Sequence, residues 1–268
     1  MNRAKRSALA GVITGLLLAG LSATSATALP EIGRCTAKAG GKYTDGNCTS
    51  KGIGSFEFEK NALKKGFTSA GGESHLIFES GSEIVCTTES ATGEYLENGS
   101  PASTKEVHLV TAKFNGCTLP LFGVPCQTKG KAEGEVITTK LKGALVYVSG
   151  QKTPSVVVAQ GLSPEVKKKG FAEFECPAVG VSVYVGEGPG KGHETILADI
   201  GPVNVMSTTA FEKYQQVKSG QQLPQSKEGS LVIDNLESSF SGPNGTFERA
   251  SELLETTITN EEPLEIKA

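Results

Sequence analysis

The period of the apolar residues constrains the fold of this chain more than any other feature of its sequence. In Glu106–Phe114 apolar and polar residues alternate, so that His108, Val110, Ala112 and Phe114 fall on one face. Segments of this kind recur along the chain, and Gly, Pro, Asn or Ser interrupts them about every ten residues. The pattern predicts an all-β protein, built as an antiparallel sandwich or a partly closed barrel.

Further segments have the alternation or the β-branched content of strands. They are Glu135–Thr138, Leu145–Val148, Ser155–Ala159, Val181–Val185, Thr195–Ile200, Ser230–Asp234 and Leu264–Ile266. Two stretches are instead predicted to be helical: Thr209–Val217, and Phe247–Leu254, where Ala250, Leu253 and Leu254 are spaced for one helix face.

The N-terminus has the three parts of a secretory signal peptide. Arg3, Lys5 and Arg6 precede an apolar run from residue 8 to residue 21, and Ala26-Thr27-Ala28 supplies small residues for the peptidase. The run is shorter than the ~20 residues that span a bilayer. We therefore expect cleavage after Ala28, an extracellular location, and no transmembrane segment in the mature chain.

The mature chain divides by composition into a small and a large part. Residues 29–66 contain the turn sequences Ala39-Gly40-Gly41 and Asp45-Gly46-Asn47 and few apolar residues. They predict a small N-terminal element rich in Gly and Cys, with a disulfide loop. Residues 67–268 are predicted to form the all-β domain, after a signal peptide at residues 1–28.

All six cysteines lie in the mature part, and an even number in an exported chain predicts three disulfides. Six cysteines allow fifteen pairings, among which the sequence alone does not choose. Proximity in the sequence favours the pairs Cys35–Cys48, Cys117–Cys126 and, by remainder, Cys86–Cys176. A zinc site is not expected, because zinc ligands come at close spacings and His75, His108 and His193 are scattered.

The charge of the chain argues against a polyanionic partner. Without the three basic residues of the signal peptide, the mature part has 23 basic and 29 acidic residues, a net charge of −6. An acidic surface repels nucleic acid. We therefore expect no nucleic-acid partner.

The motifs that could contribute catalysis are incomplete. Gly186–Thr195 is rich in glycine and follows a predicted strand, but its spacing departs from that of a phosphate-binding loop, so we interpret it as a hairpin loop. The pairs Glu57/Glu59 and Glu173/Glu175 each fall on one strand face, and a polar outer face explains them without chemistry. No catalytic residue, metal ligand or cofactor is assigned.

Several segments together resemble a known group of proteins. They are Gly33-Arg34-Cys35, Gly41–Asp45 with Cys48, Ile84-Val85-Cys86, Phe114–Cys117, Gly134–Ile137, Leu141–Leu145 and the ending Thr259–Ala268. Nearly all of the mature chain is similar to uncharacterised secreted proteins of actinobacteria, which occur as many paralogues. The resemblance implies export and a shared β core, and it carries no activity and no functional residues.

These observations favour a secreted, non-catalytic binding or interaction module. We expect its partner to be an extracellular ligand or a component of the cell envelope, contacted through loops such as Leu119–Pro125 and Gly186–Gly192. The alternative is a secreted hydrolase whose active site has no recognisable motif. A third possibility is a structural surface protein that associates with itself through strand edges.

Overall fold

The computed structural model describes residues 30–60, 65–96, 106–148, 157–166, 169–188, 195–217, 220–223 and 236–268. The all-β prediction is confirmed, and the sheet closes completely into a barrel, so the sandwich alternative is wrong. In these ranges no helix has the length and apolar character needed to cross a membrane. The predicted signal peptide and the predicted strand Ser230–Asp234 lie outside the described residues.

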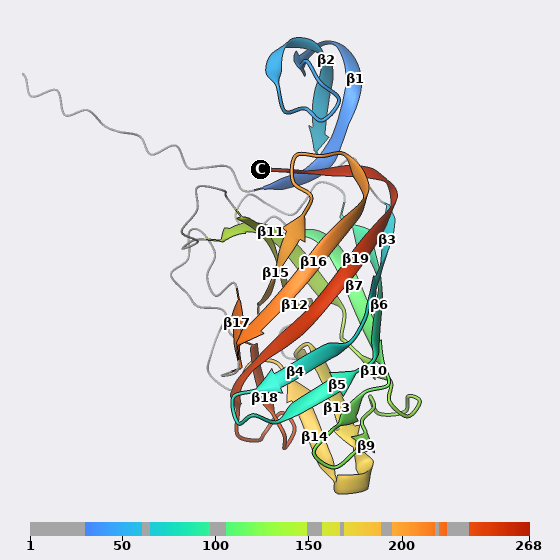
Figure 1. Ribbon diagram of the computed structural model, residues 1–268, viewed down its shortest axis with the longest axis vertical. Helices are drawn as coiled ribbons and strands as arrows, with labels where there is room; N and C mark the ends of the chain where they lie inside the picture. The colour runs from blue at the N-terminus through green and yellow to red at the C-terminus, as the bar shows by residue number, and fades with distance from the viewer. Residues whose placement is uncertain are drawn as a thin grey trace, which may run out of the picture.

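Eight antiparallel strands form the barrel (Figure 1). In order around the wall they are β3 (Gly66–Gly71), β6 (Thr88–Tyr95), β7 (Glu106–Asn115), β11 (Leu141–Val148), β12 (Val157–Pro164), β15 (Ile196–Gly201), β16 (Ser207–Val217) and β19 (Glu248–Lys267). Pairing of β19 with β3 closes the ring. The barrel strands therefore follow one another in chain order, which is an up-and-down arrangement.

The connections at one end of the barrel carry a second ring of short strands, drawn at the bottom of Figure 1. Its members are β4 (Ser74–Phe78), β5 (Glu83–Cys86), β8 (Thr118–Leu119), β9 (Val124–Pro125), β13 (Ala172–Cys176), β14 (Val181–Val185) and β18 (Leu236–Ser239), together with the first part of β19. Two backbone hydrogen bonds between Gln127 and Glu175 close this ring. We call it the lower ring, and it covers that end of the barrel.

Three short elements complete the two rings. They are β10 (Val136–Ile137), which pairs with β7, β17 (Gln221–Leu223), which pairs with β16, and the 3-10 turn η2 (Pro177–Val179) between β13 and β14.

Three disulfides are present, but two of the three predicted pairs are wrong. Cys35–Cys48 is confirmed, whereas Cys86 pairs with Cys117 and Cys126 pairs with Cys176. Cys86 and Cys117 lie one step along the ladder from Val85↔Thr118, and Cys126 and Cys176 lie one step from Gln127↔Glu175. The amide of Cys126 also donates to the carbonyl of Cys117, at 2.9 Å.

These four cysteines therefore form a single row across β5, β8, β9 and β13. The predicted Cys117–Cys126 bridge would join the two middle members of the row. Cys86 and Cys176 would then remain at its ends, three strand spacings or about 14 Å apart, which is too far for a disulfide. Position in the row decides the pairing, and separation along the chain does not.

The N-terminal hairpin consists of β1 (Glu31–Tyr43) and β2 (Lys51–Lys60), and it lies beyond the upper end of the barrel in Figure 1. Only the start of β1, from Glu31 to Gly33, pairs with the end of β19. The carboxylate of Asp45 accepts backbone N–H groups from Asn47, Thr49 and Ser50 and so shapes the loop. These bonds, that of Ser50 first, lower the pKa of Asp45 to about 2.

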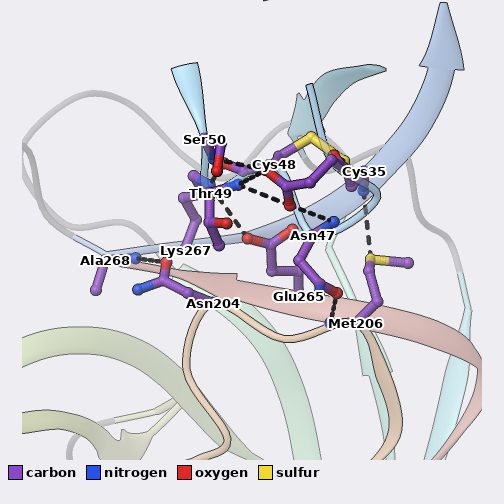
Figure 2. Close-up of polar contacts among 11 residues, drawn as sticks. Cys35, Asn47, Cys48, Thr49, Ser50, Asn204, Met206, Glu265, Lys267 and Ala268 are labelled. Carbon is purple, nitrogen blue, oxygen red and sulfur yellow. Dashed lines mark hydrogen bonds and ion pairs between the residues drawn. A yellow bond between two sulfur atoms is a disulfide. The ribbon is translucent and has the colours of Figure 1, made fainter. Parts of the chain in front are cut away.

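The disulfide loop of the hairpin docks on the connection between β15 and β16 (Figure 2). The backbone amide of Met206 donates to Oδ1 of Asn47 at 3.0 Å, and the amide of Cys35 donates to the sulfur of Met206 at 3.3 Å. Asn204 accepts a hydrogen bond from the amide of Ala268, which holds the C-terminus at the same place. Contacts distant in sequence thus fix the hairpin to the barrel.

Beneath this loop lies an ion pair between neighbours on β19. The Lys267 ammonium contacts Oε1 of the fully buried Glu265 at 3.2 Å and donates to the carbonyl of Cys48. The same ammonium lies 4.7 Å from the centre of the Tyr43 ring and 5.6 Å from that of Phe58. Lys267 therefore joins the end of the barrel strand to both strands of the hairpin.

The two predicted helices are wrong, because both segments are strands. Thr209–Val217 lies in β16 and pairs with β15 on one side and β19 on the other. Most of Phe247–Leu254 lies in β19, which places Ala250 and Leu254 inside and leaves Leu253 exposed. The helical spacing of these three residues is coincidental, and pairing on both edges overrides it.

The predicted strand Glu106–Phe114 matches β7, and its four predicted inward residues all line the interior. Val181–Val185 matches β14, and the other described strand predictions overlap β10, β11, β12, β15 and β19. The close fit inside the barrel requires glycine opposite the largest inward rings. A Cβ on Gly143 would lie 2.1 Å from the His108 ring, and one on Gly93 would lie 2.1 Å from the Phe67 ring.

Candidate functional site: an acidic cavity inside the barrel

A cavity of about 130 Å³ lies within the barrel, above the lower ring. Apolar side chains make up most of its lining: Phe67, Leu76, Ile84, Ala91, Val110, Ala112, Phe114, Val136, Leu141, Leu162, Phe171, Ala172, Phe174, Val185, Ile196, Leu236, Leu254 and Ile258. Eight-stranded barrels have room either for their own side chains or for one small ligand. Here the cross-strand neighbours Ala91 and Ala112 are both small, which leaves space open between β6 and β7.

Three glutamates also line this cavity: Glu89 from β6, Glu212 from β16 and Glu252 from β19. Strand alternation directs them inward. In β16 the side chain of Glu212 is 6% exposed, whereas its neighbour Phe211 is 51% exposed and covers Gly201 on the outside of the barrel. The usual preference of a barrel wall for apolar residues inside and polar residues outside is therefore reversed at this point.

Glu89 and Glu212 belong to one row of residues across four consecutive strands. Glu212 lies opposite Thr256, Thr256 opposite Gly71, and Gly71 opposite Glu89. The absent side chain at Gly71 leaves room for the carboxylate, because a Cβ there would lie 3.1 Å from Oε2 of Glu89. The row places two acids on the same wall, separated by one hydroxyl and one glycine.

Glu89 has hydrogen-bond partners for both of its oxygens. The Ser69 hydroxyl donates to Oε1 at 3.0 Å, and the Thr256 hydroxyl donates to Oε2 at 2.9 Å. Burial raises the pKa of Glu89, and the two hydroxyl bonds oppose that effect.

Glu212 has two polar neighbours. The Tyr214 hydroxyl donates to Oε2 at 3.2 Å, and the side chain of Gln160 is close enough to hydrogen-bond with the carboxyl, while Oε1 is buried with no partner of hydrogen-bond geometry among the residues that the structure describes. Burial raises the pKa of Glu212 to about 7, and the negative charge of Glu89 adds to the shift. A carboxyl of this kind exchanges its proton near neutral pH.

Glu252 is the third acid and has a similar environment. Its Oε1 is also buried without a partner in the described part of the chain. Burial raises the pKa of Glu252 to about 8, while a hydrogen bond with Ser74 and the charge of His75 act in the opposite direction. Two of the three cavity acids therefore change protonation in the neutral range.

His108 does not supply a balancing charge. Its side chain is 2% exposed, and burial lowers its pKa to about 4, so it is neutral at pH 7. Its Nε2 has no partner among the described residues, and its ring packs edge-on against Phe67 at 5.3 Å. No lysine or arginine is among the described residues that line the cavity.

A second, smaller space of about 20 Å³ lies further up the barrel. His108, Gln160 and Ile258 line both spaces and so form the layer between them. The upper space has the size of a water site, and the larger cavity is the candidate for a ligand.

The residues that the sequence singled out lie elsewhere. Glu57 forms an ion pair with Lys42 on the hairpin, Glu59 and Glu173 are exposed, and Glu175 is half-buried beside Gln127. In the loop Leu119–Pro125 the side chains of Leu121 and Phe122 are exposed at the tip of the β8–β9 hairpin. Of Gly186–Gly192 only residues 186–188 are described.

Sequence reasoning missed all three cavity acids. A usable signal was present in Thr88–Tyr95, where Glu89 has the same parity as Ala91 and Tyr95 and therefore faces inward with them. Among the described residues, Cys35, Cys48 and Glu265 bring possible metal-ligand atoms within 4.8 Å of one another. The two sulfurs are bonded to each other, so this group does not offer thiolate ligands to a metal.

The cavity combines an apolar body with buried, unpartnered oxygen acceptors. Such a site can enclose a small molecule and bind its polar group. It can also hold and release protons near pH 7. Comparison with protein-family models, with curated protein sequences and with solved structures gives no match to this chain.

Proposed function

We propose that this protein is a secreted, non-catalytic binding protein that encloses a small molecule inside its barrel. The observation that carries the proposal is the 130 Å³ cavity lined by Glu212, whose buried Oε1 has no hydrogen-bond partner among the described residues. An engineered cavity of about 150 Å³ accommodates benzene. A buried acceptor without a partner costs free energy, on the order of 1–3 kcal/mol, and a bound ligand would remove that cost.

The extracellular location belongs to the same proposal. Three disulfides support it, because disulfides form and persist in oxidising compartments. The signal-like N-terminus and the resemblance to secreted proteins agree with it. A location outside the cytoplasm would expose the barrel to small molecules of the medium or of the cell envelope.

The test is native mass spectrometry of the mature chain, purified without denaturation from the cells that make it. We expect a retained small mass that Ala91→Leu removes, because leucine fills the space between β6 and β7. Ala70→Leu is the matched control, since Ala70 lies on the outer face of the neighbouring strand β3. Identical spectra for the wild type and Ala91→Leu, with no retained mass and no effect of added apolar probes on the cavity methyl resonances, would refute the proposal.

A hydrolase is the second candidate function, favoured by the pKa values of about 7 for Glu212 and about 8 for Glu252. A carboxyl that titrates near neutral pH is suited to general acid–base catalysis. In that case Glu212→Gln would abolish turnover of a substrate that it still binds. In a binding protein the same substitution changes affinity, and there is no turnover to lose.

A further inference from the structure

The cavity wall is divided into an acidic half and a largely apolar half. Glu89 and Glu212 come from β6 and β16, which with β3 and β19 are consecutive around the barrel, and Glu252 lies in the first part of β19, opposite Leu76 of the lower ring. The other four strands, β7, β11, β12 and β15, contribute apolar lining residues together with His108 and Gln160. The floor from the lower ring is mostly apolar, with Leu76, Phe171 and Phe174. A ligand that fits this wall has one polar end and one apolar end.

An ionised glutamate at the polar end requires a ligand that donates hydrogen bonds. Both unpartnered glutamate oxygens, Oε1 of Glu212 and Oε1 of Glu252, are acceptors when the carboxyls are ionised. An ammonium group has three N–H donors and a charge opposite to theirs. A carboxylate or phosphate would instead be repelled, because the described lining contains acids and no lysine or arginine.

When the cavity holds no cation, the protein disfavours the ionised form of these acids. Glu212 is near Glu89 and Tyr95 from β6, Gln160 from β12 and Tyr214 from its own strand, and none of these groups is positively charged at neutral pH. Glu252 is near Ser74 and His75 of β4 and also receives repulsion from Glu89. A bound cation would favour the ionised carboxylates, so its binding would release protons.

The size of the cavity limits the apolar end. Since a cavity of about 150 Å³ accommodates benzene, one of 130 Å³ suits a body of about five or six non-hydrogen atoms. We propose that the ligand is a small organic cation, a protonated amine on a compact apolar body, whose ammonium group binds Glu212. This inference rests on the proposed function and specifies the chemistry of the same site.

Cyclopentylamine and cyclopentanol provide a matched pair of probes. They have the same number of non-hydrogen atoms, and only the amine is charged at about pH 7.5. We would measure both by isothermal titration calorimetry on the full mature chain, in two buffers of different ionisation enthalpy and at equal ionic strength. We expect the amine to bind about tenfold tighter or better and to release protons, more at about pH 6.5 than at about pH 7.5.

Variants of the cavity glutamates test whether these acids cause the preference for the amine over the alcohol. Glu212→Gln should weaken the amine about tenfold, reduce the proton release and leave the alcohol almost unchanged. Glu255→Gln is the control, because Glu255 faces outward on β19 and pairs with Lys213. Glu252→Gln is a second inward variant, and thermal unfolding of each variant shows whether it is folded.

The outcomes separate the two proposals. If the alcohol binds as tightly as the amine, or the amine binds without proton release, the inference of a cationic ligand is overturned and the enclosed binding site stands. If neither probe binds and Ala91→Leu changes nothing, both proposals fail. Should Glu212→Gln not fold, the wild-type comparison and Glu252→Gln still decide between these outcomes.

Discussion

The Tyr214 hydroxyl donates to Oε2 of Glu212 at 3.2 Å, and the side chain of Gln160 also interacts with that carboxyl. Within the described part of the chain, Oε1 of the same group is buried without a partner of hydrogen-bond geometry. Tyr214 also lies close enough to Glu89 and Glu252 for their charges to raise its pKa, after the larger effect of burial. One phenol thus adjoins the three acids of the cavity, which makes this corner of the barrel responsive to pH.

We expect Glu212→Gln to stabilise the protein above neutral pH and to have little effect in acid. The pKa of Glu212 is about 7 in the folded chain and near 4.5 in the unfolded chain. Between these values the folded state binds more protons, so the free energy of unfolding falls as pH rises. A neutral amide removes this loss, which amounts to about 3 kcal/mol. Urea unfolding at several pH values measures it.

The comparison between wild type and variant matters more than either curve alone. Asp45, whose pKa is lowered to about 2, contributes stability with the opposite sign, lost as pH falls. It is present in both proteins and cancels in the difference. A difference between Glu212→Gln and wild type that stays constant from acid to alkaline pH would show that Glu212 ionises normally.

The cysteine row predicts a defined peptide map. Digestion without reduction should release Cys86 linked to Cys117, and Cys126 linked to Cys176. Replacing either pair by alanine should cost about 4 kcal/mol, because the bridges close loops of 31 and 50 residues. A disulfide-linked Cys117–Cys126 peptide from folded, fully oxidised protein would contradict the pairing that the row implies.

Lys267→Met should loosen the attachment of the N-terminal hairpin and leave the barrel folded. The substitution leaves Glu265 buried without its cation and removes the contacts with Tyr43 and Phe58. Breaking a buried ion pair costs about 3 kcal/mol, so amide exchange in the hairpin should rise about 100-fold. Hydrogen-exchange mass spectrometry resolves the hairpin from the barrel.

Lys213→Met is the matched control for this experiment, because Lys213 forms an exposed ion pair with Glu255. Exposed pairs contribute little, so exchange should stay unchanged throughout. If Lys267→Met and Lys213→Met behave alike, the hairpin is held by strand pairing and the disulfide loop, and the ion pair is dispensable.

Strand periodicity predicted the fold class well, and in β7 it predicted the inward residues correctly. It failed at β16, because Glu212 faces inward and Phe211 outward, which inverts the pattern that identifies a barrel strand. The same inversion is the reason that the cavity glutamates were not identified from the sequence. An inward glutamate is a poor choice for a core, so reasoning from apolar periodicity selects against the positions that give this cavity its chemistry.

The disulfide pairing could not be predicted from the sequence, for a different reason. The four cysteines of the row come from strands whose neighbours are set by ring closure through Gln127 and Glu175. That contact joins residues far apart in the chain, and no local signal reports it. Only Cys35–Cys48, which closes a loop within one hairpin, was accessible to an argument from proximity.

The most direct test of the whole account is a ¹³C NMR titration of the Glu212 carboxyl, assigned by its loss in Glu212→Gln. We expect a midpoint of about 7 in the free protein, and a lower midpoint when cyclopentylamine saturates the cavity. That result would show a buried acid that ionises in response to a bound cation. A midpoint near 4.5, unchanged by the amine, would contradict both the environment assigned to Glu212 and its role in binding.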